Sequence, residues 1–96
     1  MMDRKEIDAN IISYLRSYDP ERIGIFGSLA RQEITQDSDI DILVKFKDTL
    51  TLLQLVRIHR ELSQILGKKV DVVTESSLKN ERIRKHIYND LQIIFE

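Results

Sequence analysis

The chain has 96 residues, of which 42% are hydrophobic and 32% are charged, and its formal net charge is −1. This length supports a single domain over residues 1–96, and the near-neutral charge argues against direct binding of nucleic acid or of an anionic membrane. The chain has no Cys, which excludes disulfides and thiolate metal sites and fits a cytoplasmic location. It shows neither the apolar region of a signal peptide nor 18 consecutive apolar residues, so we expect no membrane partner.

The first half of the chain predicts a helix, a strand and a short second helix. Apolar residues recur at helical spacing over residues 3–18, and Asp19-Pro20 ends this pattern. Residues 22–27 predict a strand. Gly27-Ser28 then leads into a short helix expected over 29–33, with Ser28 as its N-cap.

The second half of the chain predicts three strands that alternate with helices. The expected elements are a strand over 39–46, a helix over 50–66, a strand over 69–73, a helix over 78–89 and a short strand over 91–95. Asp48-Thr49 is the expected start of the first of these helices, and Gly67 is its expected stop. Ser76-Ser77 is the expected start of the second. The apolar stripe of the 50–66 helix is predicted to be Leu52, Leu55, Val56, His59, Leu62 and Leu66.

The two faces of the 39–46 strand differ in polarity. Alternate residues of a strand point to the same face. One face is wholly apolar, and the other carries Asp39, Asp41, Leu43 and Lys45. In the 69–73 strand, Asp71 faces away from Val70 and Val72. We therefore expect an α/β (α+β) fold with a small mixed sheet, helices mainly on one face, and an acidic cleft on the other face.

Asp39 and Asp41 interrupt a run that is otherwise apolar. Their backbone positions are about 6–7 Å apart at ~3.3 Å per residue. Two like charges at that distance repel by roughly 2.5 kcal/mol at an effective dielectric of about 20. A divalent cation such as Mg²⁺ explains why they are kept, since it binds one or two carboxylates together with substrate phosphates. Asp71 on a neighbouring strand would complete a site for two metal ions and is a candidate proton acceptor, although it could also be an ordinary surface acid.

Residues ahead of the acids suit a phosphate site. Gly27 lets the backbone approach a phosphate closely, and Ser28 with the first amides of the expected short helix would bind an anion. Arg31 could reach the phosphates of a nucleotide, or it could be an exposed helix arginine. These pieces predict phosphoryl-type transfer, with Asp39, Asp41 and Asp71 as metal ligands and Gly27, Ser28 and Arg31 as nucleotide-binding residues.

The string Gly27-Ser28, ten residues, then Asp39-Ile40-Asp41 resembles the signature of the DNA polymerase β-like nucleotidyltransferase superfamily. The fuller string GSLARQE…SDIDILV is similar to its minimal nucleotidyltransferase (MNT) branch, which includes the antitoxins of HEPN/MNT toxin–antitoxin pairs. The resemblance covers almost the whole chain, with VDVV around Asp71. It implies a polymerase β-like fold and Mg²⁺-dependent transfer of AMP from ATP, in the antitoxins to a tyrosine of the HEPN partner. Many relatives have a small residue where this chain has Gln32.

The size of the chain leaves little room for a second substrate-binding domain. We therefore expect a partner protein, a HEPN toxin, to supply the acceptor hydroxyl. Two alternatives remain open: a non-catalytic module that neutralises a partner by binding it, and a transferase acting on a small molecule. A homo-oligomer is also open, because the apolar residues 93–95 could lie in a core or an interface.

Overall fold

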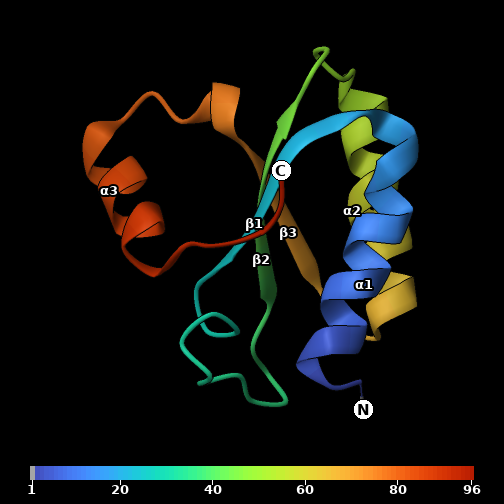
Figure 1. The fold of residues 1–96 in the computed structure, drawn as a ribbon, viewed down its shortest axis with the longest axis vertical. Coiled ribbons are helices and arrows are strands. Elements are labelled where there is room, and N and C mark those ends of the chain that lie inside the picture. Colours follow the sequence, from blue (N-terminus) through green and yellow to red (C-terminus); the bar gives the residue numbers. More distant parts are fainter. Residues whose placement is uncertain (1) are drawn as a thin grey trace.

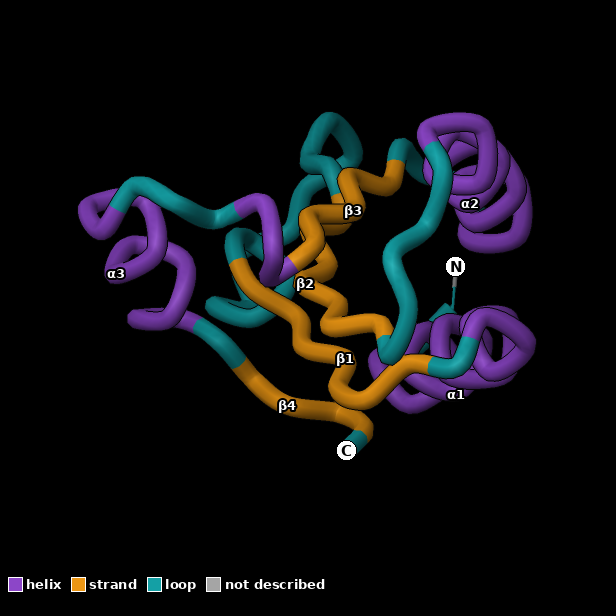
Figure 2. The backbone as a smooth tube through the Cα atoms, turned by 90° about the horizontal axis from the view of Figure 1, so that it is seen from above, coloured by secondary structure: helices purple, strands orange, loops and turns teal. Residues whose placement is uncertain are grey.

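A four-stranded mixed sheet forms the centre of the computed structural model, which describes residues 2–96 (Figures 1 and 2). The strand order is β3-β2-β1-β4. Strands β2 and β3 are parallel, and β1 is antiparallel to both β2 and β4. The strands are β1 (Pro20–Phe26), β2 (Ile40–Phe46), β3 (Val70–Thr74) and β4 (Gln92–Phe95). The predicted mixed sheet and the short C-terminal strand are therefore confirmed.

Two helices, α1 (Arg4–Leu15) and α2 (Leu52–Leu66), cover one face of the sheet, and the shorter α3 (Glu81–Asp90) lies on the other (Figure 2). Most of the apolar face of β2 is buried beneath α1 and α2, with Ile40, Ile42 and Val44 each at 0% exposure. On the opposite face Leu43 packs with Leu78 and Ile87. Helices thus lie mainly on one face, as predicted, and α3 covers only part of the face that carries the acids.

Local sequence signals account for most helix ends. Asp3 caps α1 by accepting a hydrogen bond from the Glu6 amide, and a 3₁₀ turn, η1 (Arg16–Tyr18), follows α1. Asp19, which ends this turn, has a left-handed φ of 54°. Gly67 ends α2 with φ of 69°, a conformation in which glycine lacks the steric cost of a side chain.

The starts of α2 and α3 differ from the prediction. Thr51 caps α2 in a reciprocal pair with Gln54, so the helix begins after Thr51 and not after Asp48-Thr49. Ser76 and Ser77 belong to a separate 3₁₀ turn, η2 (Glu75–Ser77). Asn80 caps α3 by accepting from two backbone amides. The later starts of α2 and α3 have the same cause. The reciprocal cap at Thr51 and the double cap at Asn80 satisfy more unpaired helix amides than a cap at the residues predicted from the sequence.

The inward face of α2 is rotated from the predicted stripe. Ile58 and Leu62 are fully buried, whereas Leu52 is 76% exposed and Val56 is 52% exposed. Leu53, next to them, is 81% exposed. These three residues form an apolar ridge on the first turns of α2, which we call the α2 ridge. Within residues 2–96, no helix has both the length and the apolar content needed to cross a bilayer.

Candidate active site

Asp41 and Asp71 lie side by side on the two parallel strands. They are direct partners in the β2–β3 register, and neighbouring strands are about 4.8 Å apart. Asp39 lies two residues before Asp41, at the entrance to β2. Burial raises the pKa of Asp41, and the negative charges of Asp71 and Asp39 raise it further, while Arg31 opposes them. The acid face predicted from strand alternation therefore exists and concentrates negative charge.

Gly27 lies against Asp41. It follows Phe26, which pairs with Asp41 in the β1–β2 register. A Cβ atom on Gly27 would overlap the Oδ2 atom of Asp41, and the residue has φ of +74°. Both the space and the backbone conformation thus require glycine here.

The segment after Gly27 is a series of turns and not the short helix that the sequence predicted. Backbone hydrogen bonds join the Arg31 amide to the Gly27 carbonyl and the Glu33 amide to the Ser28 carbonyl. Gln32 has a left-handed φ of 60°, which prevents a helix from continuing. Five residues also cannot repay the cost of starting an isolated helix. Ser28 is therefore not a helix N-cap, and backbone amides of this turn could contact a phosphate only without the help of a helix dipole. We call residues 27–33 the Gly-Ser turn.

Arg31 is held by two carboxylates. Its Nη1 atom lies 2.6 Å from Oδ2 of Asp90, and its Nε atom lies 2.9 Å from Oε2 of Glu33. Hydrogen bonds from these two carboxylates raise the pKa of Arg31. The side chain is 39% exposed, so it stays accessible to a ligand. Sequence reasoning missed Asp90 because it is 59 positions away in the chain, and it missed Glu33 because the sequence predicts a helix over residues 29–33, in which residues two apart do not face each other.

Strand β3 is held in place by α2. The Ser63 hydroxyl accepts a hydrogen bond from the Val70 amide at 3.0 Å, and it donates to the His59 carbonyl at 2.6 Å. The His59 Nδ1 atom lies 3.1 Å from the Val70 carbonyl oxygen. These contacts fix the residue directly before Asp71. No sequence signal ties Ser63 or His59 to Asp71, because the contact forms only when α2 packs beside β3.

The acids fit a hard cation only in part. Asp41 and Asp71 have no hydrogen-bond or ion-pair partner among residues 2–96, and oxygen donors of this kind suit Mg²⁺. The Asp39 carboxylate lies 3.8 Å from Nζ of Lys69. Within the described chain, no three His, Cys, Asp or Glu side chains converge as a ready metal site. The structure thus brings Asp41 and Asp71 together and leaves Asp39 beside a lysine.

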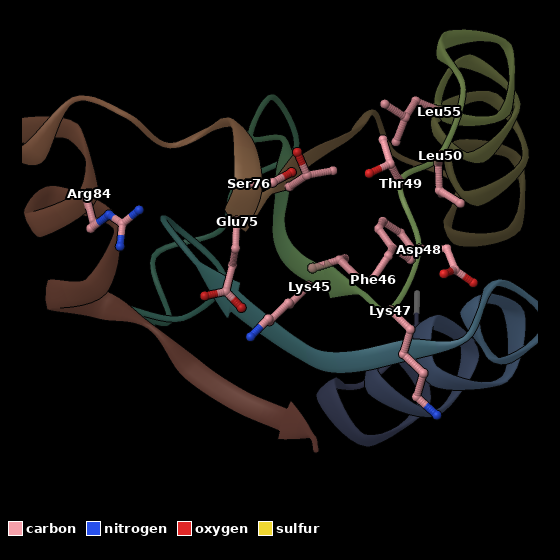
Figure 3. Close-up of a pocket in the computed structure, with 12 residues that line it drawn as sticks. Lys45, Phe46, Lys47, Asp48, Thr49, Leu50, Leu55, Glu75, Ser76 and Arg84 are labelled. Atoms are coloured by element: carbon pink, nitrogen blue, oxygen red, sulfur yellow. The ribbon is translucent and has the colours of Figure 1, made fainter.

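A cavity of about 400 Å³ lies at the other end of β2 and β3 (Figure 3). Its walls come from the residues after β2, from η2 and from the start of α2, including Phe46, Leu50, Leu55 and Glu75. The acids lie at the opening residues of the two strands, whereas this cavity lies at their closing residues. It is therefore separate from the acid face.

Residues 9–96 match the family described as "Polymerase beta, Nucleotidyltransferase". The chain therefore belongs to this family of nucleotidyltransferases, and the family predicted from the Gly-Ser and Asp-Ile-Asp spacing is confirmed.

Relatives with names show which kinds of nucleotidyltransferase the chain is similar to. The chain is 48% identical over 77 residues to a Methanocaldococcus jannaschii protein named "Putative protein adenylyltransferase", covering 80% of this chain and 83% of that one. It is 36% identical over 84 residues to "Protein adenylyltransferase MntA" of Thermococcus cleftensis, covering 83% and 85%. A crystal structure of a toxin–antitoxin with AMP-PNP aligns with a TM-score of 0.83 and 26% identity, over 92% of this chain and 72% of that one.

Proposed function

We propose that this protein is a Mg²⁺-dependent protein adenylyltransferase that acts as an antitoxin in the cytoplasm. It transfers AMP from ATP to a hydroxyl, expected to be a tyrosine, of a HEPN toxin partner. One observation carries the proposal most: Asp41 and Asp71 are in register on parallel strands and unpaired among residues 2–96, and Asp41 lies directly beside Gly27. Such a pair is costly for the fold alone, and a nucleotide with its cation offsets that cost.

The roles of the residues follow from their positions. Asp39, Asp41 and Asp71 would hold Mg²⁺, expected as two ions, which neutralises the triphosphate and lowers the pKa of the attacking hydroxyl. Lys69, whose Nζ lies 3.8 Å from the Asp39 carboxylate, would compete with the ion for this ligand. Gly27 and Ser28 would contact the phosphates through the backbone of the Gly-Ser turn, and Arg31 would contact them through its guanidinium.

The transfer itself is a displacement at phosphorus. The acceptor oxygen forms a bond to the α-phosphorus of ATP, and the bond from that phosphorus to the bridging oxygen breaks. Pyrophosphate leaves with the electron pair. The proton of the acceptor hydroxyl passes to the Asp71 carboxylate, the acid that lies in register with Asp41.

A mass measurement tests this proposal. The protein is mixed with ATP, Mg²⁺ and the protein encoded beside it, and we expect the partner to gain the mass of one or more AMP units. Asp39→Asn and Asp41→Asn should each lower the rate at least ~100-fold, since each removes a charge that acts on the transition state. Asp37→Asn changes an exposed acid of the preceding loop and should leave the rate unchanged. Transfer by the Asp41 variant near the wild-type rate would refute the metal assignment.

A second function, neutralisation by binding alone, is favoured by the α2 ridge. Leu52, Leu53 and Val56 are large apolar residues that are each more than half exposed, and contiguous exposed apolar patches are typical of protein interfaces. Calorimetry separates the two functions. Tight binding of the partner with no binding of ATP in the presence of Mg²⁺ would favour the binding module, whereas binding of both favours the enzyme.

A further inference from the structure

The Gly-Ser turn is fastened by residues from the C-terminal end of the chain. Asp90 ends α3 and lies 2.6 Å from the Arg31 guanidinium. Two residues later, the Gln92 side-chain amide donates to the Ala30 carbonyl at 3.0 Å. Gln92 also pairs with Ile25 on β1, the strand that runs into Gly27. The α3–β4 junction (residues 90–92) therefore contacts the turn twice, from one side.

Asp90 is the better placed of the two carboxylates that hold Arg31. Its side chain is 16% exposed, whereas that of Glu33 is 63% exposed. A partly buried carboxylate is screened less by water and holds a guanidinium more firmly than an exposed one. Glu33 also belongs to the same turn as Arg31, so it cannot fix the arginine relative to the rest of the fold. Asp90 can, because it is carried by α3.

The contacts leave the Nη2 atom of the guanidinium available. Asp90 accepts from Nη1 and Glu33 from Nε. Nη2 donates no hydrogen bond to any of residues 2–96. Guanidinium groups bind phosphate through two neighbouring donors. Arg31 is thus held through Nε and Nη1 and can offer Nη2 to a phosphate oxygen, and displacement of the exposed Glu33 would open the Nε–Nη2 pair for a bidentate contact.

We propose that Asp90 is a positioning residue that orients Arg31 toward the triphosphate of ATP bound beside the acids. This inference rests on the proposed function. Asp90 touches no reacting atom; it acts through Arg31. Its role is to place a positive charge where a triphosphate must approach three carboxylates of the same sign, Asp39, Asp41 and Asp71.

Calorimetric titration of the full chain with ATP and Mg²⁺ tests the inference. We expect Asp90→Ala to raise the Kd for ATP about tenfold or more, since the charge-assisted contact of Arg31 to phosphate is weakened and tenfold corresponds to about 1.4 kcal/mol. Asn89→Ala, at the exposed neighbouring position, should leave the Kd within about twofold. Asp90→Asn keeps a hydrogen-bond acceptor and should give an intermediate Kd; it also carries the test if the alanine variant fails to fold.

A double-mutant cycle separates positioning from a merely structural role. Arg31→Ala should weaken ATP binding at least as much as Asp90→Ala. In the Arg31→Ala background, adding Asp90→Ala should change the Kd less than about twofold, because coupled residues are not additive. Two results overturn the inference. One is a Kd for ATP that is unchanged or lower in the Asp90 variants. The other is that Asp90→Ala raises the Kd as much in the Arg31→Ala background as in the wild-type protein. If these occur while Asp41→Asn still abolishes AMP transfer, the proposed function stands; if the wild-type chain binds no ATP, the proposed function fails first.

Discussion

Gly27 leaves the space that the Asp41 carboxylate occupies. Gly27 directly follows β1, Asp41 lies on the adjacent strand β2, and any side chain at position 27 would meet Oδ2 of Asp41. The closeness of these two residues links the Gly-Ser turn to the strand that carries Asp41. A substitution at either residue is therefore expected to disturb the other.

Gly27→Ala is expected to lower both stability and AMP transfer. A left-handed alanine costs about 1–2 kcal/mol, and here the methyl group must also displace Asp41. Gly67→Ala is the matched control, since Gly67 has a similar φ of 69° with nothing within 4 Å of the added Cβ. Thermal melting should show Gly67→Ala lowered by about 4–8 °C per kcal/mol of strain and Gly27→Ala lowered further.

Activity measurements complete the comparison of these two glycines. Gly67→Ala should transfer AMP at the wild-type rate below its melting temperature, whereas Gly27→Ala should lose transfer at the same temperature. Equal melting temperatures for the two variants would mean that the Asp41 side chain moves aside without cost, which would contradict its close packing against Gly27.

Asp41→Asn is expected to stabilise the protein in buffer without Mg²⁺. The substitution removes a half-buried charge that lies beside Asp71 and close to Asp39. We expect the melting temperature at pH 7 to rise by several degrees, at roughly 4–8 °C for each kcal/mol of repulsion relieved. Asp37→Asn, in the exposed loop, should change it little.

Adding Mg²⁺ should reverse the order of the melting temperatures of the wild-type protein and Asp41→Asn. A ligand that binds only the folded state stabilises it by about 2.7 kcal/mol at 100 times its Kd. The wild-type protein should therefore melt at a higher temperature with Mg²⁺, and Asp41→Asn should respond much less. The same response to Mg²⁺ in both proteins would remove Asp41 from the set of metal ligands.

Much of this site could be predicted from local pattern. Alternation along residues 39–46 placed the acids opposite the core, because a strand has a period of two. The segment 29–33 is predicted as a short helix that follows Ser28 as its N-cap. Burial of Leu29 and Ala30 against the core decides its conformation instead, and that packing has no signature within the segment.

Long-range contacts are the part that could not be predicted. Arg31 and Asp90 are 59 positions apart, and Arg22 and Glu75 are 53 apart. Each pair meets only because α3 and η2 fold over the face of the sheet that carries the acids. Charged residues are frequent in this chain, so sequence alone offers many equally good partners for each arginine.

Glu75 is expected to make stability depend on pH in the acid range. It accepts hydrogen bonds from Arg22 at 2.7 Å and from Tyr88 at 2.9 Å. Burial opposes ionisation of Glu75, but these hydrogen bonds and the charges of Arg22 and Lys45 outweigh it and lower its pKa from 4.5. A lowered pKa means that the stabilisation is complete above pH 4.5 and is lost as the pH falls through the folded value.

Glu75→Gln tests this dependence by removing the titrating group. The variant should melt at a lower temperature than the wild-type protein at pH 7, and the difference should shrink as the pH falls below 4.5. Asp48→Asn, an exposed acid nearby, should follow the wild-type curve. A constant difference between wild-type protein and Glu75→Gln from pH 7 to pH 3 would contradict the ionic origin of the stabilisation.

The α2 ridge is expected to bind the partner protein and to play no part in nucleotide binding. Leu53 is the most exposed residue of the ridge. The ridge lies at the start of α2, which follows the C-terminal end of β2, whereas the acids lie at the N-terminal end of β2 (Figure 1). Leu53→Asp puts a charge on this apolar surface and should weaken partner binding at least tenfold, which corresponds to about 1.4 kcal/mol.

Gln64→Asp introduces the same charge at an exposed polar position of the same helix and should leave binding unchanged. Calorimetry with the partner and then with ATP measures both effects; loss of ATP binding in Leu53→Asp, or partner binding as tight as in the wild-type protein, would show that the ridge does not have this role.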